Sequence, residues 1–321
     1  MGTVDRGEGT MSVAASYAEF GLREARGVSP AYERLSAAIA ADDEVLGLVA
    51  SLPEAKRQPN LLYGVVRLLG GPVDDPVAFR DFVVANWPAV AAQASARATQ
   101  TNEVGRCAVL LPVLARLPQP IALLEVGASA GLSLFLDRYA YRYGDHRVGA
   151  GEPVLECKLT GVAPPDRLPE VVWRAGLDLN PLRVTDPRDV AWLEALVWPE
   201  HEHRRARLRA AAAVAAADPP LLVRGDLVDD LPALAALAPP DATLVVFHTS
   251  VLYQVPPQRR AAFVELVGRL AGHWVSVEAA DVVEHGPLPA PPADTFHNVL
   301  SCDGVPLAYT RPHGQGMTWF A

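Results

Sequence analysis

An apolar run that ends in a turn of small residues, at positions 121–131, constrains the fold of this chain more than any other feature. The run IALLEV has the length of a buried β-strand, and Gly127 and Gly131 enclose three further small residues. A strand, a tight turn and a following helix predict the first unit of an α/β sheet. We expect the helix to begin near Gly131, with its main-chain N–H groups facing a ligand carboxylate or phosphate.

Short apolar runs alternate with helical stretches after this turn, which predicts a mainly parallel sheet with helices on both faces. The further strands are expected at residues 171–179, 220–226, 242–250 and 273–279. The tail predicts a closing antiparallel hairpin. A Gly- and Pro-rich insertion at about 144–170, containing the strand-like PVLECKLTG, separates the first two strands.

The chain before residue 120 shows three- and four-residue apolar spacing, which predicts helices. They are expected at residues 30–52, 59–70, 76–98 and 102–117. We therefore predict a disordered lead-in (1–11), a helical N-terminal cap or lid domain (12–118) and an α/β domain (119–321).

Charge and cysteine usage narrow the class of protein. A net charge of −9 and a pI near 5.4 leave no basic footprint for nucleic acid. The three cysteines are far apart and the histidines show no ligand spacing, so we expect no metal site and a reducing, cytoplasmic compartment. No apolar run approaches the ~18 residues that a membrane span needs.

Ser129 lies at the centre of a G-x-S-x-G pattern, the turn that exposes the nucleophile of α/β hydrolases. The helical upstream region and the lack of an H-G-G-G oxyanion segment argue against a serine hydrolase. A cofactor-binding turn explains more residues, and a tight turn without a ligand is the plain structural alternative.

Acidic and amide side chains end the first three predicted strands. They are Glu125, Asp178 with Asn180, and Asp226. Ligands of open α/β sheets bind at the carboxyl ends of the strands, where such side chains can reach a ribose or an adenine amino group. Each acid can instead cap the helix that follows it.

The segment LVVFHTSVLYQVPP (244–257), together with Glu125, Asp178 and Asp226, resembles the class I S-adenosylmethionine (SAM)-dependent methyltransferases. The resemblance implies a Rossmann-like, methyltransferase-type sheet and SAM as the cofactor. The residues implied to bind SAM are Glu125, Gly127, Ala128, Ser129, Gly131, Asp178, Asn180 and Asp226. The chain departs from the methyltransferase pattern at Ser129, which replaces the middle glycine, and in the 53 residues between positions 125 and 178.

The whole chain also resembles an uncharacterised bacterial family of unknown function. The resemblance is carried by EVGASAGL and by four other segments: RQPNLL (57–62), TQTNEVGR (99–106), GLDLNP (176–181) and VWPE (197–200). It implies a fold but no settled chemistry.

His248 is the best candidate for a general base, because it follows an apolar strand and imidazole is the side chain most often used as a base near neutral pH. A hydrogen-bonded structural histidine is the alternative. Tyr253 is expected to edge the substrate pocket, and Glu278, at the end of HWVSVE, is a second acid–base candidate.

Polar residues at two helix starts, together with Ser250, are candidates for substrate binding. They are Arg57, Asn60, Gln100, Asn102, Glu103 and Arg106. A guanidinium suits bidentate carboxylate recognition. Helix capping is the alternative explanation.

Three functions follow from these features. The first is SAM-dependent methyl transfer to an oxygen or nitrogen of a small molecule. The second keeps the fold without SAM and catalyses another displacement, an elimination or ring closure. The third is a non-catalytic, ligand-binding partner subunit. A protein partner or homo-oligomer stays open, and neither nucleic acid nor membrane is expected as a partner.

Overall fold

The computed structural model describes residues 12–292 and 296–321, so the predicted disorder of residues 1–11 lies outside the described residues. The chain forms two compact units. Among the described residues, the helical unit contains 12–101 and the segment Ala191–Arg205. The sheet unit contains Asn102–Val190 and the described residues from 206 to 321. This division differs from the predicted boundary at residue 118, because 102–118 and 191–205 each belong to the other unit.

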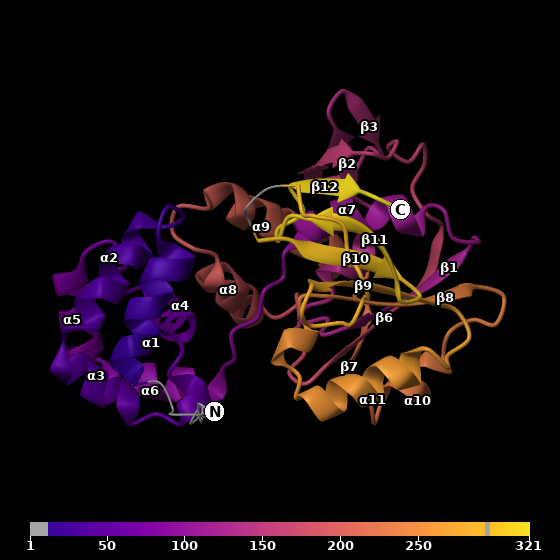
Figure 1. Cartoon of the computed structure of the whole chain (residues 1–321). Coiled ribbons are helices and arrows are strands. Elements are labelled where there is room, and N and C mark those ends of the chain that lie inside the picture. The colour runs from indigo at the N-terminus through magenta and orange to yellow at the C-terminus, as the bar shows by residue number, and fades with distance from the viewer. Residues whose placement is uncertain (1–11, 293–295) are drawn as a thin grey trace, which may run out of the picture. The chain divides into compact units, whose positions relative to one another are not determined.

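The helical unit confirms the helices predicted before residue 100 (Figure 1). Its helices are α1 (Val13–Phe20), α2 (Pro30–Ile39), α3 (Asp43–Ala50), α4 (Pro59–Leu68), α5 (Pro76–Ala85) and α6 (Trp87–Ala96). The predicted helices 30–52 and 76–98 are each divided in two. Asp42 causes the first division, because its carboxylate accepts the N–H groups of Glu44 and Val45 and begins a new helix. Among the described helices, none is long and apolar enough to cross a membrane.

The sheet unit is built on nine strands in the order β5-β12-β11-β10-β9-β8-β1-β6-β7. The parallel strands are β1 (Ile121–Val126), β6 (Val171–Asp178), β7 (Leu221–Arg224), β8 (Thr243–Thr249) and β9 (His273–Ala279). The antiparallel strands are β10 (Asn298–Cys302), β11 (Val305–Thr310) and β12 (Gly316–Trp319). The predicted α/β class with a mostly parallel sheet and an antiparallel C-terminal part is therefore confirmed.

Strand β1 is the point at which the strand order reverses, since it pairs with β6 on one side and with β8 on the other. Glu125 lies opposite Gly176 of β6 and Phe247 of β8. Open α/β sheets bind ligands outside the carboxyl ends of the strands at such a reversal. We call this edge of the sheet, where β1, β6 and β8 end, the carboxyl edge.

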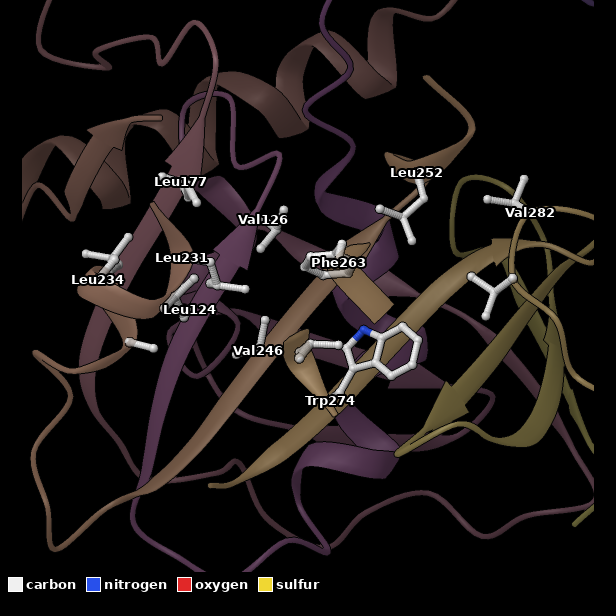
Figure 2. Close-up of a cluster of buried hydrophobic side chains, with 14 residues drawn as sticks. Leu124, Val126, Leu177, Leu231, Leu234, Val246, Leu252, Phe263, Trp274 and Val282 are labelled. Atoms are coloured by element: carbon white, nitrogen blue, oxygen red, sulfur yellow. The ribbon is translucent and has the colours of Figure 1, made fainter. Parts of the chain in front are cut away.

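One face of the sheet is covered by α10 (Leu231–Ala235) and α11 (Pro257–Val267), which lie on the same side of it in Figure 1. Figure 2 shows the buried cluster beneath them, with Leu124, Val246 and Trp274 from the strands and Phe263 from α11. Because strand side chains alternate between faces, Leu124 and Val126 point into this cluster while Glu125 points to the opposite face.

The connection from β1 to β6 differs from the prediction. The expected helix after Gly131 is a four-residue 3-10 turn, η4 (Leu132–Phe135). It leads into a three-stranded sheet of β2 (Ala140–Tyr143), β3 (His146–Val148) and β4 (Val154–Glu156). Strand β5 (Lys158–Thr160) then joins the main sheet beside β12. The aromatic alternation of residues 139–143 favours a strand and ends the helix early.

The predicted long helix 186–216 consists of α8 (Pro187–Leu196) and α9 (Glu202–Ala217). Pro199 lies in the break between them, where it cannot supply a helical N–H group. The last predicted helix, 102–117, begins later than expected, with a 3-10 turn (Val104–Arg106) before α7 (Cys107–Leu114).

Candidate functional site

Glu125 is the most perturbed acid at the carboxyl edge. Glu125 is only 5 % exposed, and its Oε2 atom is buried without a hydrogen-bond partner among the described residues. Burial raises the pKa of Glu125 to about 8; the Ser133 hydroxyl lowers it, the charge of Asp178 raises it and the charge of Arg106 lowers it. Near neutral pH the side chain is therefore mostly a neutral acid with one unsatisfied oxygen, a state suited to proton exchange.

Four of the five main-chain N–H groups of the glycine turn (residues 127–131) are bonded inside the protein. Those of Gly127 and Ala128 donate to the Leu177 carbonyl at 2.8 and 3.3 Å, and that of Gly131 donates to Ala128 at 2.7 Å. The Ser129 N–H donates to Asp178 Oδ2 at 2.7 Å. Together with the four-residue η4, this means that most amides of the turn are already bonded and do not form the row of free N–H groups expected for a cofactor.

The small size of the turn residues is required by packing within the protein. Gly127 has φ +70°, and a Cβ on it would lie 2.5 Å from the Val251 side chain. Gly131 has φ +68°, and a Cβ there would lie 3.1 Å from both Leu222 and Pro220. Neighbouring side chains, rather than a ligand, therefore explain why glycine stands at these two positions.

Ser129 adopts a left-handed conformation, with φ 51°, that a non-glycine residue rarely takes. It is 5 % exposed, and its Oγ is buried with no hydrogen-bond partner among the described residues. No described histidine is therefore hydrogen-bonded to this hydroxyl, as the base of a serine hydrolase would be. The strained backbone and the unpaired hydroxyl together mark Ser129 as a residue that costs stability.

We expect Ser129→Gly to stabilise the protein. Glycine removes the left-handed strain and the buried, unpaired hydroxyl, which together should increase the free energy of unfolding by about 1–2 kcal/mol. Urea unfolding of the two proteins measures the difference. If Ser129→Gly instead destabilises the chain by a similar amount, Oγ makes a stabilising contact and does not await a ligand.

Asp178 and Asn180 hold the turn in place. Besides Ser129 N–H, the Asp178 carboxylate accepts the Asn180 N–H through Oδ1 at 2.7 Å. The side chain predicted to bind a ribose thus receives two main-chain donors of its own unit. Asn180 Oδ1 lies 3.5 Å from the guanidinium of Arg224.

Asp226 lies at the start of the segment that leads to α10. Its Oδ1 accepts the N–H groups of Val228, at 2.7 Å, and Asp229, at 3.3 Å, and pairs with Arg259. Burial raises the pKa of Asp226, but these N–H groups and the Arg259 guanidinium lower it by more than burial raises it. The net shift of the pKa is therefore downward. Asp226 thus caps the turn that precedes α10, whereas the N-cap residue of α10 itself is Asp230, so the helix-capping alternative holds only in part.

Arg106 is a buried cation at the carboxyl edge, 8 % exposed. Its Nη1 donates to the Thr249 carbonyl at 2.9 Å, and its Nε donates to the Pro312 carbonyl at 2.9 Å. The guanidinium therefore joins the end of β8 to the β11–β12 turn, and its charge acts on Glu125.

Glu103 and Asn102 lie beside Arg106 in the same segment. Glu103 Oε1 accepts hydrogen bonds from the Gly105 N–H at 3.0 Å and from Arg207 Nη2 at 2.6 Å. The Oε2 atom of Glu103 lies 3.6 Å from His313 Nδ1. Asn102 Nδ2 is buried without a hydrogen-bond partner among the described residues. The helix-capping alternative holds in part, because Glu103 does satisfy an N–H of the following turn.

His248 lies in the core on the face covered by α11, and it is fully buried. Trp274 Nε1 donates to His248 Nε2 at 3.0 Å, so the ring carries its proton on Nδ1, which donates to Glu278 Oε1 at 2.8 Å. Both ring nitrogens are thereby occupied. The geometry matches the structural histidine that was the alternative to a general base, so we assign His248 no catalytic step.

Glu278 joins the ends of β8 and β9. Its Oε1 also accepts the N–H groups of Val251 at 2.8 Å and Leu252 at 3.1 Å, while its Oε2 is buried without a partner among the described residues. The oxygen that receives three donors supports the loop after β8. Glu278 is therefore a positioning residue for that loop.

Ser250 and Tyr253 lie on the loop after β8. Ser250 has φ 54°, and its Oγ accepts Asn298 Nδ2 at 3.2 Å. Tyr253 is 60 % exposed, on the 3-10 turn Leu252–Gln254.

The remaining substrate-binding candidates, Arg57, Asn60 and Gln100, belong to the helical unit. Arg57 Nε donates to the Leu52 carbonyl at 2.8 Å, and Asn60 Oδ1 accepts Trp198 Nε1 at 3.1 Å. These two contacts organise the helical unit itself. Of the predicted substrate-binding residues, four belong to the sheet unit, which also contains Glu125: Asn102, Glu103, Arg106 and Ser250. The three candidates of the helical unit do not.

Sequence reasoning missed Ser133, Thr249 and the Pro312–His313 turn. Ser133 follows Gly131 by two positions, within the segment expected to be helical. Thr249 and Pro312 contribute main-chain carbonyls to Arg106, which no side-chain pattern in the sequence signals. The Thr249 hydroxyl lies 3.4 Å from Arg106 Nη1 as well.

Comparison with known proteins identifies a family for this chain. The model of a family described as "uncharacterized protein conserved in bacteria (DUF2332)" covers residues 14–319. No curated protein and no solved structure matches the chain. The match extends over both units, which agrees with the segments 57–62, 99–106, 176–181 and 197–200 that carried the resemblance to a bacterial family. The chain therefore belongs to the DUF2332 family of uncharacterised bacterial proteins.

Proposed function

We propose that the sheet unit carries a small-molecule active site at the carboxyl edge, with Glu125 as its proton-exchanging group. The observation that carries this proposal is the buried, unpaired Oε2 of Glu125 in a side chain whose pKa is raised to about 8. Glu125 is the penultimate residue of β1, where the strand order reverses and α/β sheets bind their ligands. A ligand donor or acceptor at Oε2 would remove the cost of the unpaired oxygen.

The reaction that this geometry supports best is a SAM-independent displacement, an elimination or ring closure on a small molecule. Neutral Glu125 donates its proton to a leaving oxygen as the carbon–oxygen bond breaks and the electron pair stays on that oxygen. The proton lost from the substrate on elimination, or from its attacking group on ring closure, then restores neutral Glu125. Ser129 Oγ is the second group free to bind the substrate.

Methyl transfer from SAM is a second proposal, favoured by the strand order β7-β6-β1-β8-β9 and by acids at three successive strand ends. The glycine turn weighs against it, since four of its five amides are bonded to Leu177, Ala128 and Asp178. The residues of the turn therefore do not fit SAM in the way that the resemblance implies, and we derive no step through it.

Thermal unfolding at pH 7 separates the two proposals. A ligand at ~100 times its dissociation constant adds about 2.7 kcal/mol, which raises the midpoint of a chain of this size by about 5 °C or more. We expect no such shift with SAM or S-adenosylhomocysteine. We expect a shift with a member of a panel of small hydroxy acids and amino acids.

The matched variants locate the binding site. Glu125→Gln should abolish the shift caused by the panel compound, and the exposed Glu265→Gln should retain it. A shift with SAM would favour methyl transfer instead. A panel shift that survives Glu125→Gln would place the site elsewhere and overturn the proposal.

A further inference from the structure

Three side chains with different donor atoms meet at the other end of the sheet. His273 is the first residue of β9, Cys302 is the last residue of β10, and Asp303 begins the turn to β11. One ring nitrogen of His273, the Cys302 Sγ and a carboxylate oxygen of Asp303 lie within 4.8 Å of one another. This group lies at the start of β9, whereas Glu125 lies at the end of β1.

The register of the sheet brings the group together. Cys302 lies opposite Val275 in the antiparallel β9–β10 pair, and His273 is two residues before Val275. Residues two apart on a strand share a face, so Cys302 and His273 are diagonal neighbours on one face. Gly272, the residue before His273, has φ +133° and lies close to the main chain of Leu244. A Cβ on residue 272 would lie 2.3 Å from the Leu244 carbonyl oxygen, so only glycine fits there.

The third donor is held rigidly by the turn. Asp303 and Gly304 have φ 52° and 78°, the conformation of a two-residue hairpin turn that favours Asp-Gly. The Asp303 N–H donates to the Trp274 carbonyl, and Asp303 Oδ1 accepts the Trp274 N–H, each at 2.8 Å. These two bonds leave Oδ2 facing His273 Nδ1 at 2.7 Å and Cys302 Sγ at 3.7 Å.

We propose that His273, Cys302 and Asp303 bind a divalent cation of the Zn²⁺ class. Imidazole, thiolate and carboxylate are the three protein donors that Zn²⁺ takes, at about 2.0–2.3 Å each. In tetrahedral coordination two donors of one ion are thus about 3.3–3.8 Å apart. Side-chain rotations have to shorten the present separations, which reach up to 4.8 Å, to that range. Metal binding deprotonates a thiol outright, so the cation replaces the proton of Cys302.

The surroundings fit a bound cation. The main-chain bond from Trp274 to Oδ1 orients the carboxylate, as second contacts of metal ligands commonly do. The side chains of His273 and Asp303 are 30 % and 47 % exposed, which gives the ion a route from solvent and leaves the fourth position to water.

Titration of the untagged, chelator-treated full-length chain with Co²⁺ alone, followed by displacement with Zn²⁺, tests the proposal. We expect one Co²⁺ per chain and a thiolate-to-cobalt charge-transfer band in the near ultraviolet. Cys302→Ser should remove the band and weaken binding at least about tenfold. Asp303→Asn keeps the turn, because Asn-Gly also favours it, and should weaken binding by a similar factor.

Cys157→Ser is the matched control, because Cys157 is a buried cysteine of the same unit, and it should bind Co²⁺ like the unaltered chain. Thermal unfolding of each variant checks that it is folded. If Co²⁺ does not bind stoichiometrically, His273 and Asp303 form a hydrogen-bonded pair and no metal site, and the proposal is overturned. Binding that keeps its charge-transfer band in Cys302→Ser would overturn it as well.

Discussion

The free energy of unfolding is expected to decrease as the pH rises from about 4.5 to about 8, and Glu125→Gln is expected to abolish most of this decrease. The folded protein holds the Glu125 proton up to a pKa of about 8, whereas the unfolded chain releases it near the ordinary value of 4.5. The folded state therefore binds more protons in this window, so the free energy of unfolding decreases as the pH rises through it. Each unit of pKa difference contributes about 1.4 kcal/mol.

The sign of the effect is specific to a raised acid. Below about pH 4.5 Glu125 is protonated in both states and the full stability is present; above about pH 8 it is ionised in both and the loss is complete. Glutamine is neutral and of similar shape, so the variant should match the unaltered chain at pH 5 and exceed its stability at pH 9 by several kcal/mol.

Urea unfolding at pH 5, 7 and 9 measures this difference. The exposed Glu265→Gln should follow the pH dependence of the unaltered chain, because its side chain is 66 % exposed. Parallel pH curves for the unaltered chain and Glu125→Gln would contradict the raised pKa of Glu125.

Arg106→Ala is expected to cost on the order of 3 kcal/mol or more of unfolding free energy. Its guanidinium makes charge-assisted hydrogen bonds to the Thr249 and Pro312 carbonyls in a buried position. Each such bond contributes about 1.5–3 kcal/mol, and truncation leaves the two carbonyls unpaired.

The same substitution should act on Glu125. The charge of Arg106 lowers the pKa of Glu125, so its removal should raise that pKa and move the pH window of destabilisation upward. Arg106→Lys keeps a charge but lacks the planar fork, so an intermediate loss is expected.

Arg116→Ala is the control for Arg106. Arg116 is exposed and lies 5.0 Å from the ring centroid of Trp319, a contact that contributes about 0.5–1 kcal/mol. Denaturant unfolding compares the variants. Equal, small losses for Arg106→Ala and Arg116→Ala would show that the Arg106 bonds do not hold the edge of the sheet together.

The strands of the sheet were predictable because each is a short apolar run bounded by turn residues, as at 121–127 and 171–179. Their ends were therefore predictable too, and Glu125 was placed correctly at the end of β1. The four-residue η4 was not, because strand pairing of residues 140–143 with β3 and β4 decides where the helix ends. Such pairing is a tertiary effect that local propensity does not contain.

The roles of polar side chains were less predictable than their positions. Asp178 bonds the Ser129 N–H, and Trp274 donates to His248, through contacts that depend on how distant segments pack. The group of His273 with Cys302 and Asp303 likewise depends on the β9–β10 register. Spacing along the chain alone therefore predicts no metal site.

The pKa of Glu125 is the quantity on which the proposed function depends most directly. The chemical shift of its ¹³C-labelled carboxyl carbon, assigned by its absence in Glu125→Gln, should be followed by NMR from pH 4 to pH 10. A midpoint near 8 is the expected result, and it would identify Glu125 as a neutral acid at the carboxyl edge. A midpoint near 4.5 would contradict the account, since Glu125 would then be an ordinary carboxylate with no proton to exchange near neutral pH.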